Sequence, residues 1–362
     1  MPNPRDYSLV GPNSRAAVAA GLTAAEWYHT EIPRKEMKSL MQRRDWPAIR
    51  DTLLWFALMA ASAAGAIYFY GSWFAVPFFA AYGVLYGSAS DARWHECGHG
   101  TAFRAQWMNR VIFQMASFMI MREPDVTRWS HARHHTDTLI VGRDPEVAVK
   151  RPPDLLFHLL SFFPIIGAFR TLFSIVRHST GRLTAEEQDF IPEMSHGQVF
   201  LTARIWLALH VSSAAVSIWL GSWIPVLLFG ALPTIYGGWL ARYCDLTQHA
   251  GLEENVLDHR LNARTIYVNP VLGFVYWNMN YHVEHHMFPM VPYHALPKLH
   301  EMMKHDTPEA YPSTIAAYRE IIPTVLRQVK DPDHFVKRML PPTAKPYRPE
   351  LHDFAVLPQP AA

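Results

Sequence analysis

Two long stretches without acidic or basic side chains constrain this fold most. They run from Thr52 to Ser90 and from Ile205 to Ala241, and Gly71-Ser72 and Gly221-Ser222 interrupt them. Each stretch thus divides into two apolar runs of about 18 residues, close to the roughly 20 that a helix needs to cross a bilayer. The pattern predicts an all-α membrane protein with four transmembrane helices in two hairpins. Four buried helices of a large soluble core are the weaker alternative.

Charges around these runs predict how they are oriented. Basic residues precede the first run: Arg34, Lys35, Lys38, Arg43, Arg44 and Arg50. Such an excess places a segment in the cytoplasm. Both hairpins then return the chain to the cytoplasm, at Asp91 and at Arg242. The polar N-terminus has no apolar core near its start, so we expect no cleavable signal peptide.

Two further apolar segments are expected not to cross. Val111–Met121 is too short and should be interfacial or a buried cap. Leu155–Val176 is long enough, but it carries His158, Pro164 and Arg170. If it crossed, the histidine clusters described next would lie on opposite sides of the membrane. We therefore expect it to lie along the interface or to dip partway in.

The predicted domain organisation has three parts. Residues 1–50 form a cytoplasmic N-terminal segment, residues 51–300 the membrane domain, and residues 301–362 a cytoplasmic C-terminal part. Residues 302–304 and 315–329 should be helical. From Pro332 onward proline is frequent, and the tail should be extended.

Three histidine clusters follow the predicted spans. They are His95-Glu96-Cys97-Gly98-His99, His131-Ala132-Arg133-His134-His135 and His282-Val283-Glu284-His285-His286. Residues three and four apart share one face of a helix, so each cluster can aim its imidazoles at one point. Imidazole suits iron, zinc, copper and nickel. Eight imidazoles are too many for one ion, which predicts a cytoplasmic helical cap holding two ions.

Nearby side chains extend this candidate site. Asp245 and His249 follow the fourth predicted span at i and i+4, and both are candidate metal ligands. Asp245 could equally be a solvated carboxylate. Metal-bound imidazoles usually donate their other N–H to a carboxylate or carbonyl group. Four carboxylates within or near the clusters are assigned that supporting role, with ordinary surface charge as the alternative: Glu96, Asp137, Asp144 and Glu284.

Two other functions compete for the same residues. His95-Glu96-Cys97-Gly98-His99 matches the H-E-x-x-H pattern of zinc proteases, with Glu96 as general base. That reading leaves six further histidines without a role. A metal transporter or sensor should carry its ligands within the spans. The remaining histidines we considered are interpreted as ordinary hydrogen-bonded residues: His29, His158, His178, His196, His210, His334 and His352.

Composition excludes several classes of protein. A net charge of +2 over 362 residues gives no reason to expect nucleic-acid binding. Cys97 and Cys244 are the two cysteines of the sequence. They are too few for an iron–sulfur cluster or a disulfide scaffold. The sequence also contains no dinucleotide-binding fingerprint or haem domain that we can identify, so electrons for a redox reaction must come from another protein.

The three clusters resemble the histidine boxes of the membrane fatty-acid desaturase superfamily, which includes alkane and xylene hydroxylases. H-E-C-G-H, H-A-R-H-H and H-V-E-H-H occur in order, with the expected spans between them, over roughly residues 50–300. Asp245 and His249 stand where desaturases place an extra ligand, although acyl-CoA desaturases have Asn at the position of Asp245. The surroundings, Asp91–Phe103 and Arg128–Glu146, are similar to a bacterial branch of hydrocarbon oxygenases from rhizopine catabolism in rhizobia.

This resemblance implies a chemistry. Two irons held by neutral imidazoles would bind and reduce O2, and the oxidant would abstract hydrogen from an unactivated C–H bond. A second abstraction gives a double bond, and return of oxygen gives an alcohol. Hydroxylation of a methoxy carbon leads to loss of formaldehyde, which is the demethylation associated with that bacterial branch. The histidine boxes do not discriminate among these outcomes.

The resemblance also implies partners and a location. The expected function is a di-iron oxygenase of the bacterial inner membrane with a cytoplasmic active site, oxidising C–H bonds by hydroxylation or demethylation. A fatty-acyl desaturase is the alternative. A ferredoxin, Rieske-type protein or rubredoxin, with its reductase, would supply electrons. Five basic residues are candidates for docking that donor, with a solvated face or lipid contact as the alternative: Arg128, Arg133, Arg143, Lys150 and Arg151.

Overall fold

Helices make up all the regular structure in the part of the chain that the computed structural model describes, residues 5–347. Two isolated backbone bridges, Thr265 to Tyr281 and Ile266 to Tyr311, form no sheet there. The prediction of an all-α protein is confirmed for these residues. The predicted extended tail is described only to residue 347, and His352 lies outside the described residues.

The elements follow the chain in one order. They are α1 (Pro12–Ala19), α2 (Arg34–Leu40), α3 (Asp45–Tyr68), α4 (Ala75–Gly83), the π-helix η1 (Val84–Ser88), α5 (Ala89–Gly98), α6 (Gln106–Met119), α7 (Pro124–Thr136), α8 (Leu155–Leu160), α9 (Ile165–Ser179), α10 (Ala185–Phe190), η2 (Glu193–Ser195), α11 (His196–Leu220), α12 (Ile224–Leu228), α13 (Ala231–Gly237), α14 (Trp239–His249), α15 (His259–Asn262), α16 (Pro270–Val275), α17 (His282–Met287), η3 (Tyr293–Ala295), α18 (Leu296–Met303) and α19 (Thr314–Gln328).

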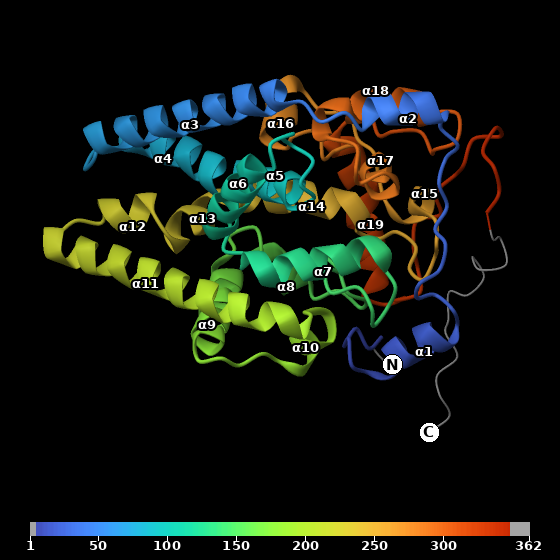
Figure 1. Cartoon of the computed structure of the whole chain (residues 1–362), viewed down its shortest axis with the longest axis horizontal. Coiled ribbons are helices and arrows are strands. Elements are labelled where there is room, and N and C mark those ends of the chain that lie inside the picture. Colours follow the sequence, from blue (N-terminus) through green and yellow to red (C-terminus); the bar gives the residue numbers. More distant parts are fainter. Residues whose placement is uncertain (1–4, 348–362) are drawn as a thin grey trace.

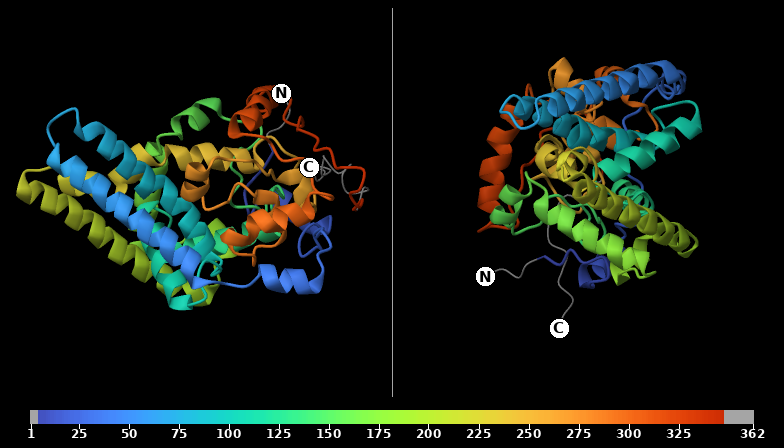
Figure 2. Two further views of the ribbon diagram at one scale, coloured as in Figure 1. Left: turned by 90° about the horizontal axis from the view of Figure 1, so that it is seen from above. Right: turned by 90° about the vertical axis from the view of Figure 1, so that its left-hand side faces the viewer.

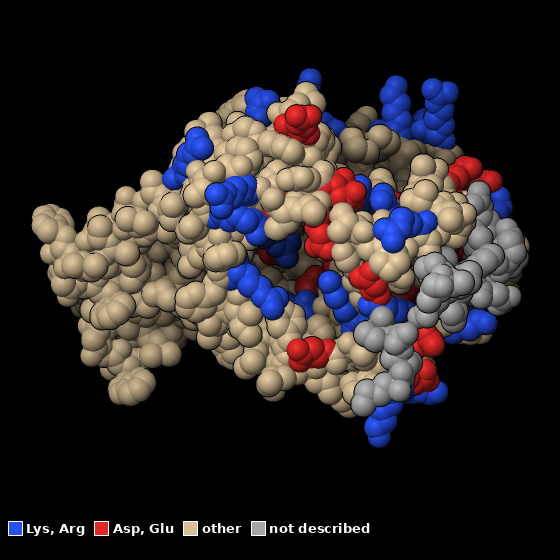
Figure 3. All heavy atoms as spheres, turned by 90° about the horizontal axis from the view of Figure 1, so that it is seen from below, with Lys and Arg blue, Asp and Glu red and all other residues tan. Residues whose placement is uncertain are grey.

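Two hairpins project from one end of the molecule. α3 and α4 form one and α11 and α12 the other, and their tips extend together away from the remaining helices (Figures 1 and 2). On the face shown in Figure 3, this projecting end carries no charged side chain, whereas the opposite end carries both basic and acidic side chains. The uncharged stretches of the sequence therefore form one continuous apolar prong.

The outgoing limb of each hairpin is a long helix, α3 or α11. Among the described residues, Arg34–Tyr68 and Glu193–Leu220 are long and apolar enough to cross a membrane. The first returning limb is helical throughout, from α4 through the π-helix η1 into α5, so η1 is a π-bulge and not a break. The second returning limb is broken, because α12 ends at Leu228 and Gly230 has a φ of 90°, which a helix cannot contain. The two hairpins are present, and the number of membrane spans stays a prediction.

Close backbone contact joins the two hairpins just before they enter the histidine-bearing half. A Cβ at Gly237 would lie 1.9 Å from the carbonyl carbon of Gly83, so only glycine permits this approach. Ser88 Oγ donates to the Gly237 carbonyl at 2.6 Å and accepts from the Ala241 amide at 2.9 Å. These contacts fix the start of α5 against the start of α14.

The two segments expected not to cross behave differently. Residues 155–176 break into α8 and α9 at Pro164 and expose apolar side chains, among them Phe169 and Phe173, which are 66% and 70% exposed. That pattern suits an interfacial helix. Residues 111–119 lie in the last part of α6, where Ile112 and Phe113 are buried while Val111 and Met115 are exposed, so this segment buries one face and leaves the other uncovered.

The N-terminal segment packs against the histidine-bearing half. Trp27 stacks on His259, with ring centroids 4.3 Å apart, and Tyr7 donates to Glu254 at 2.7 Å. α18 and α19 confirm the two helices expected after residue 300, although the first begins earlier than predicted. The domain boundaries at residues 50 and 300 stay predictions.

Candidate metal centre

Nine histidines come together from four helices in the half of the molecule away from the hairpin tips (Figure 1). α5 supplies His95 and, at its C-cap, His99. α14 ends on His249. The others stand on α7 and α17: His131, His134, His135, His282, His285 and His286. These are the nine histidines that the sequence predicts as ligands.

Their ring nitrogens form two groups, and within each group the ligand atoms all lie within 4.8 Å of one another. The five-histidine group comprises His95, His99, His131, His135 and His285, and the four-histidine group comprises His134, His249, His282 and His286. α7 and α17 serve both groups. On each helix the i,i+4 pair stays together, and the third histidine faces the other group. Two points of convergence fit the prediction of two ions.

The spacing within the five-histidine group is that of a ligand set. Nε2 of His131 lies 3.2 Å from Nε2 of His99 and 3.2 Å from that of His135. Nε2 of His285 lies 3.2 Å from that of His135. Imidazoles bound about 2.1 Å from one ion would have neighbouring nitrogens about 3.0–3.4 Å apart.

The four-histidine group shows the same spacing. Nε2 of His282 lies 2.9 Å from that of His249 and 3.0 Å from that of His286. Nε2 of His249 and Nε2 of His286 are 3.2 Å apart. Both groups therefore fit metal ions, because so many close nitrogen lone pairs have no other common partner.

Burial keeps most of these imidazoles neutral. It lowers the pKa of His99 and of His249 to about 3, with nearby imidazoles adding to the effect. Burial likewise lowers the pKa well below its usual value in His95, His135, His282, His285 and His286. A histidine must be neutral to bind a metal, so these residues are ready ligands.

Two carboxylates stand behind α7. Nδ1 of His134 lies 2.9 Å from Asp144, and Nδ1 of His131 lies 2.9 Å from Glu146. Burial opposes the charged imidazolium, but Asp144 outweighs it and raises the pKa of His134 to about 9. A metal ion competes with that proton for Nε2. Asp144 thus makes the imidazole contact expected of it, and its support of a metal ligand stays a prediction.

Glu146 was not among the residues predicted from the sequence. It lies two residues after Asp144, and the Asp144 carboxylate accepts from its amide at 2.8 Å. This turn directs both carboxylates at α7. Two carboxylates stand two residues apart in the stretch Gly142–Glu146, but nothing in that spacing indicates a contact with a helix about fifteen residues upstream.

The other three predicted carboxylates face elsewhere. Glu96 accepts from Thr101 Oγ1 at 2.8 Å and from the amide of Tyr293 at 3.0 Å. Glu284 lies 2.5 Å from Nδ1 of His300, and Asp137 pairs with Arg143. The supporting role predicted for these three is wrong. Adjacent residues on a helix point about 100° apart, so Glu96 and Glu284 turn away from the ligands beside them. Glu96 is also not placed as a protease base.

Asp245 stands apart from both histidine groups. Its carboxylate pairs with Nη1 of Arg242 at 2.5 Å, one turn earlier on α14. With its neighbours it lines a cavity of about 460 Å³ that also reaches histidines of both groups: His95, His131, His134, His249 and His282. The structure therefore places Asp245 in the wall of this cavity, and metal binding by Asp245 gains no support.

The basic docking patch predicted from the sequence is largely neutralised. Arg133 pairs with Asp189, and Arg143 pairs with Asp137. Arg151 is buried, 4% exposed, beside Glu254. Three of its five members are therefore held in ion pairs. Burial makes Arg151 unsuitable for docking an electron donor, and a docking role for the other four residues stays a prediction.

Comparison with known proteins identifies the family. The family model for fatty acid desaturases matches residues 70–318, which include all nine histidines. The chain belongs to the fatty acid desaturase family.

Curated relatives agree with this membership. A chloroplastic omega-3 fatty acid desaturase of Glycine max is 25% identical over 80% of this chain and 67% of its own length. An endoplasmic-reticulum acyl-lipid omega-3 desaturase (cytochrome b5) of Arabidopsis thaliana is 26% identical over 77% and 76%. An sn-1 acyl-lipid omega-3 desaturase (ferredoxin) of a Synechocystis strain is 26% identical over 71% and 76%. The chain is thus an O2-dependent oxidoreductase of a membrane-associated family.

Proposed function

We propose that this protein is a membrane non-haem di-iron oxygenase, which uses O2 and external electrons to oxidise C–H bonds by hydroxylation or oxidative demethylation. One observation carries the proposal: nine convergent imidazoles, most held neutral by burial, form two groups with the spacing of metal ligands. Eight of them come from the three histidine boxes and the ninth is His249.

Each group would hold one iron. α7 and α17 each contribute to both the five-histidine group and the four-histidine group, so these two helices would link the two iron sites. When bound, they supply the activation of O2 and the oxidation of a C–H bond. The protein's own part is to orient the ligands through Asp144 and Glu146, and to present substrate from the cavity beside His95 and His282.

Desaturation of a fatty-acyl chain is the second candidate function. The relatives named above are omega-3 desaturases, which favours it. Hydroxylation, demethylation and desaturation begin with the same hydrogen abstraction, so one centre serves all three. The pose of the substrate in the cavity selects among them. The resemblance to the rhizobial branch supports demethylation and stays a prediction.

An external protein would supply the electrons. Cys97 and Cys244 are both buried and cannot hold a cluster between them. Two relatives carry cytochrome b5 and ferredoxin in their names, which supports a small one-electron donor here as well. A ferredoxin, Rieske-type protein or rubredoxin with its reductase fits the bacterial setting that we propose.

The proposed setting is the bacterial inner membrane. The prong of α3, α4, α11 and α12 would insert, with the returning limbs completing four passes. The basic residues before α3 would keep the histidine groups on the cytoplasmic side. Exposed apolar side chains on α8 and α9 would rest in the interface.

Metal analysis of the purified, detergent-solubilised protein tests this proposal. We expect about two irons per chain in the wild type, lost or halved in His285→Ala. The iron-loaded protein with a ferredoxin and its reductase should then give an oxygen- and electron-dependent product. One zinc per chain, unaffected by His285→Ala, would refute the oxygenase proposal and favour the zinc protease instead.

A further inference from the structure

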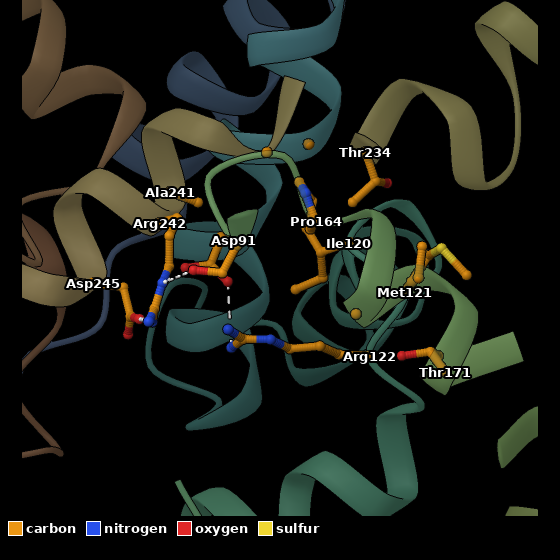
Figure 4. Close-up of a pocket in the computed structure, with 15 residues that line it drawn as sticks. Asp91, Ile120, Met121, Arg122, Pro164, Thr171, Thr234, Ala241, Arg242 and Asp245 are labelled. Atoms are coloured by element: carbon orange, nitrogen blue, oxygen red, sulfur yellow. Dashed lines mark hydrogen bonds and ion pairs between the residues drawn. The ribbon is translucent and has the colours of Figure 1, made fainter. Parts of the chain in front are cut away.

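Four charged side chains stand where two cavities meet. The cavity of about 460 Å³ beside the histidines adjoins a second of about 280 Å³. Both are lined by Asp91, Arg122, Arg242 and Asp245, which we call the charged neck. Figure 4 shows these side chains gathered on one side of the second cavity, from α5, α14 and the segment after α6. Because these side chains belong to both linings, they lie between the two cavities.

One arginine of the neck is already fully engaged. Arg242 holds Asp245 at 2.5 Å and donates from Nε to Ser161 Oγ at 3.0 Å. Its Nη2 lies 3.0 Å from Nδ1 of His158 and 3.3 Å from the carbonyl oxygen of Ala148. These contacts fasten α14 to α8, so Arg242 is a scaffold for the cavity wall, with Asp245 as its counter-ion.

The pair of Arg122 and Asp91 keeps unused hydrogen-bonding capacity. Arg122 Nη1 and Asp91 Oδ1 are 3.3 Å apart, longer than the roughly 2.7–2.9 Å of a charge-assisted hydrogen bond. The Arg122 side chain is 40% exposed and that of Asp91 18%. Arg122 also lies over the ring of Trp94, 4.5 Å from its centroid, which fixes its direction. Asp91 can therefore accept from a ligand while Arg122 donates to it.

An unfunctionalised acyl chain is a poor occupant of this neck. It would strip water from charged groups and offer them no hydrogen bond in return, which is costly. A hydroxyl or amino group replaces that water with direct bonds. Beyond the neck, the wall of the second cavity includes the apolar side chains of Ile120, Met121 and Ala168. A ligand would therefore need polar groups only at the neck, between that wall and the histidines.

We propose that the substrate carries a hydroxyl or amino group that bonds to Asp91 and Arg122 while a neighbouring C–H bond faces the histidines. This inference rests on the proposed function and narrows its substrate class. A small soluble molecule and the headgroup of a lipid both offer this chemistry. The experiment below separates these two sources.

The test uses the iron-loaded enzyme with its electron donors and three probes. They are 1-O-methylglycerol, distearoyl phosphatidylglycerol, which has headgroup hydroxyls, and distearoyl phosphatidylcholine, which has neither a hydroxyl nor an N–H. Demethylation of the first is balanced as R–O–CH3 + O2 + 2e− + 2H+ → R–OH + HCHO + H2O. Formaldehyde indicates a soluble substrate. Oxidation of phosphatidylglycerol in preference to phosphatidylcholine indicates a headgroup.

Variants decide whether the neck is responsible. We expect Asp91→Asn to raise KM for the accepted probe about tenfold or more, with kcat and iron content within about twofold of wild type. Arg122→Gln should act in the same direction, and Asp91→Glu should restore part of the loss. Asp331→Asn, at an exposed ion pair after α19, is the matched control.

The outcomes separate the two proposals. Phosphatidylcholine oxidised as readily as phosphatidylglycerol, with KM unchanged in both Asp91→Asn and Arg122→Gln, overturns the substrate class and leaves the oxygenase intact. A wild-type protein that binds no iron refutes the proposed function itself.

Discussion

The two histidine groups differ in how firmly the protein holds their imidazoles. In the four-histidine group, three rings have an oxygen at Nδ1: His134 from Asp144, His249 from the Asn262 carbonyl, and His286 from Thr138. The fourth, His282, has no hydrogen-bond partner at Nδ1 in the described part of the chain. In the five-histidine group, a carboxylate supports His131 and the sulfur of Met279 lies beside Nδ1 of His95, while Nδ1 of His135 and of His285 has no such partner there.

Burial follows the same division. All members of the four-histidine group are buried, whereas His99 and His135 are partly exposed. A ring held at Nδ1 is oriented before an ion arrives, and a ring without such a partner must be ordered by the ion itself. The comparison teaches that one group is preorganised and the other adaptable, so we expect their metals to differ in affinity.

Removing one ligand from each group is the strongest way to break this comparison. His282→Ala and His285→Ala should each abolish product formation and each cost about one of two irons. Partial chelation of the wild type should empty the five-histidine group first. The Mössbauer spectrum of the partially chelated wild type should therefore match that of His285→Ala and differ from that of His282→Ala. The reverse match would show that the less supported group binds more tightly. His334→Ala, away from both groups, is the control.

Removing the carboxylates behind α7 sharpens the comparison. Asp144→Asn and Glu146→Gln should each weaken iron binding about 10–100-fold, at the four- and five-histidine groups respectively. Asp144→Asn should have the larger effect, because the Asp144 side chain is fully buried, whereas that of Glu146 is 24% exposed. Competition with a chelator of known affinity measures both. Equal losses, or losses in the matched variant Asp137→Asn, would contradict this assignment.

Displacing the hairpins should loosen both groups together. In Gly237→Ala the new methyl group would overlap the backbone of Gly83, which cannot rotate away. The cost should be about 3 kcal/mol, near the upper end for overpacking. The melting temperature in detergent should fall accordingly, and iron should be lost equally from both groups. Gly197→Ala, where nothing lies within 4 Å, should leave both unchanged.

The smallest expected effect concerns a support that both groups share. Buried His178 lies 2.7 Å from Glu123 at the start of α7 and 3.2 Å from Glu187. Burial disfavours its charge, but these carboxylates outweigh burial and raise the pKa of His178 to about 9. The stabilisation, about 1.5 kcal/mol, is complete below pH 6.5 and is lost as pH rises through about 9.

Unfolding of wild type and His178→Gln in one detergent tests this pH dependence. The wild type should melt at a higher temperature than His178→Gln at pH 6, and the two melting temperatures should be equal at pH 10. A difference of the same size at both pH values would show that His178 acts through packing rather than charge.

The helical histidine pattern was predictable because it is local. Residues such as His131 and His135 share a face by covalent geometry alone, so convergence within each box follows from spacing. The uncharged stretches likewise predicted two hairpins. The π-bulge at Val84 and the break at Gly230 were not predicted, because a π-bulge and a positive φ depend on what packs against the backbone.

Contacts between distant segments escaped prediction for the same reason. Glu146 supports His131, and Asp245 turns to Arg242 instead of the histidines. Arg151 meets Glu254, which no spacing rule connects. Charged side chains are long and take partners wherever the fold brings them, so their roles cannot be read from position in the chain.

The sequence by itself determined the helical class, the apolar hairpins and the identity of nine convergent histidines, since these depend on periodicity and composition. Only the tertiary structure decided how those histidines divide into five and four, which carboxylates hold them, and that charged side chains line the cavity beside them. The division depends on the angle at which α5, α7, α14 and α17 meet. That angle is set by packing across the whole chain, from Gly83 against Gly237 to the segments that close around the site.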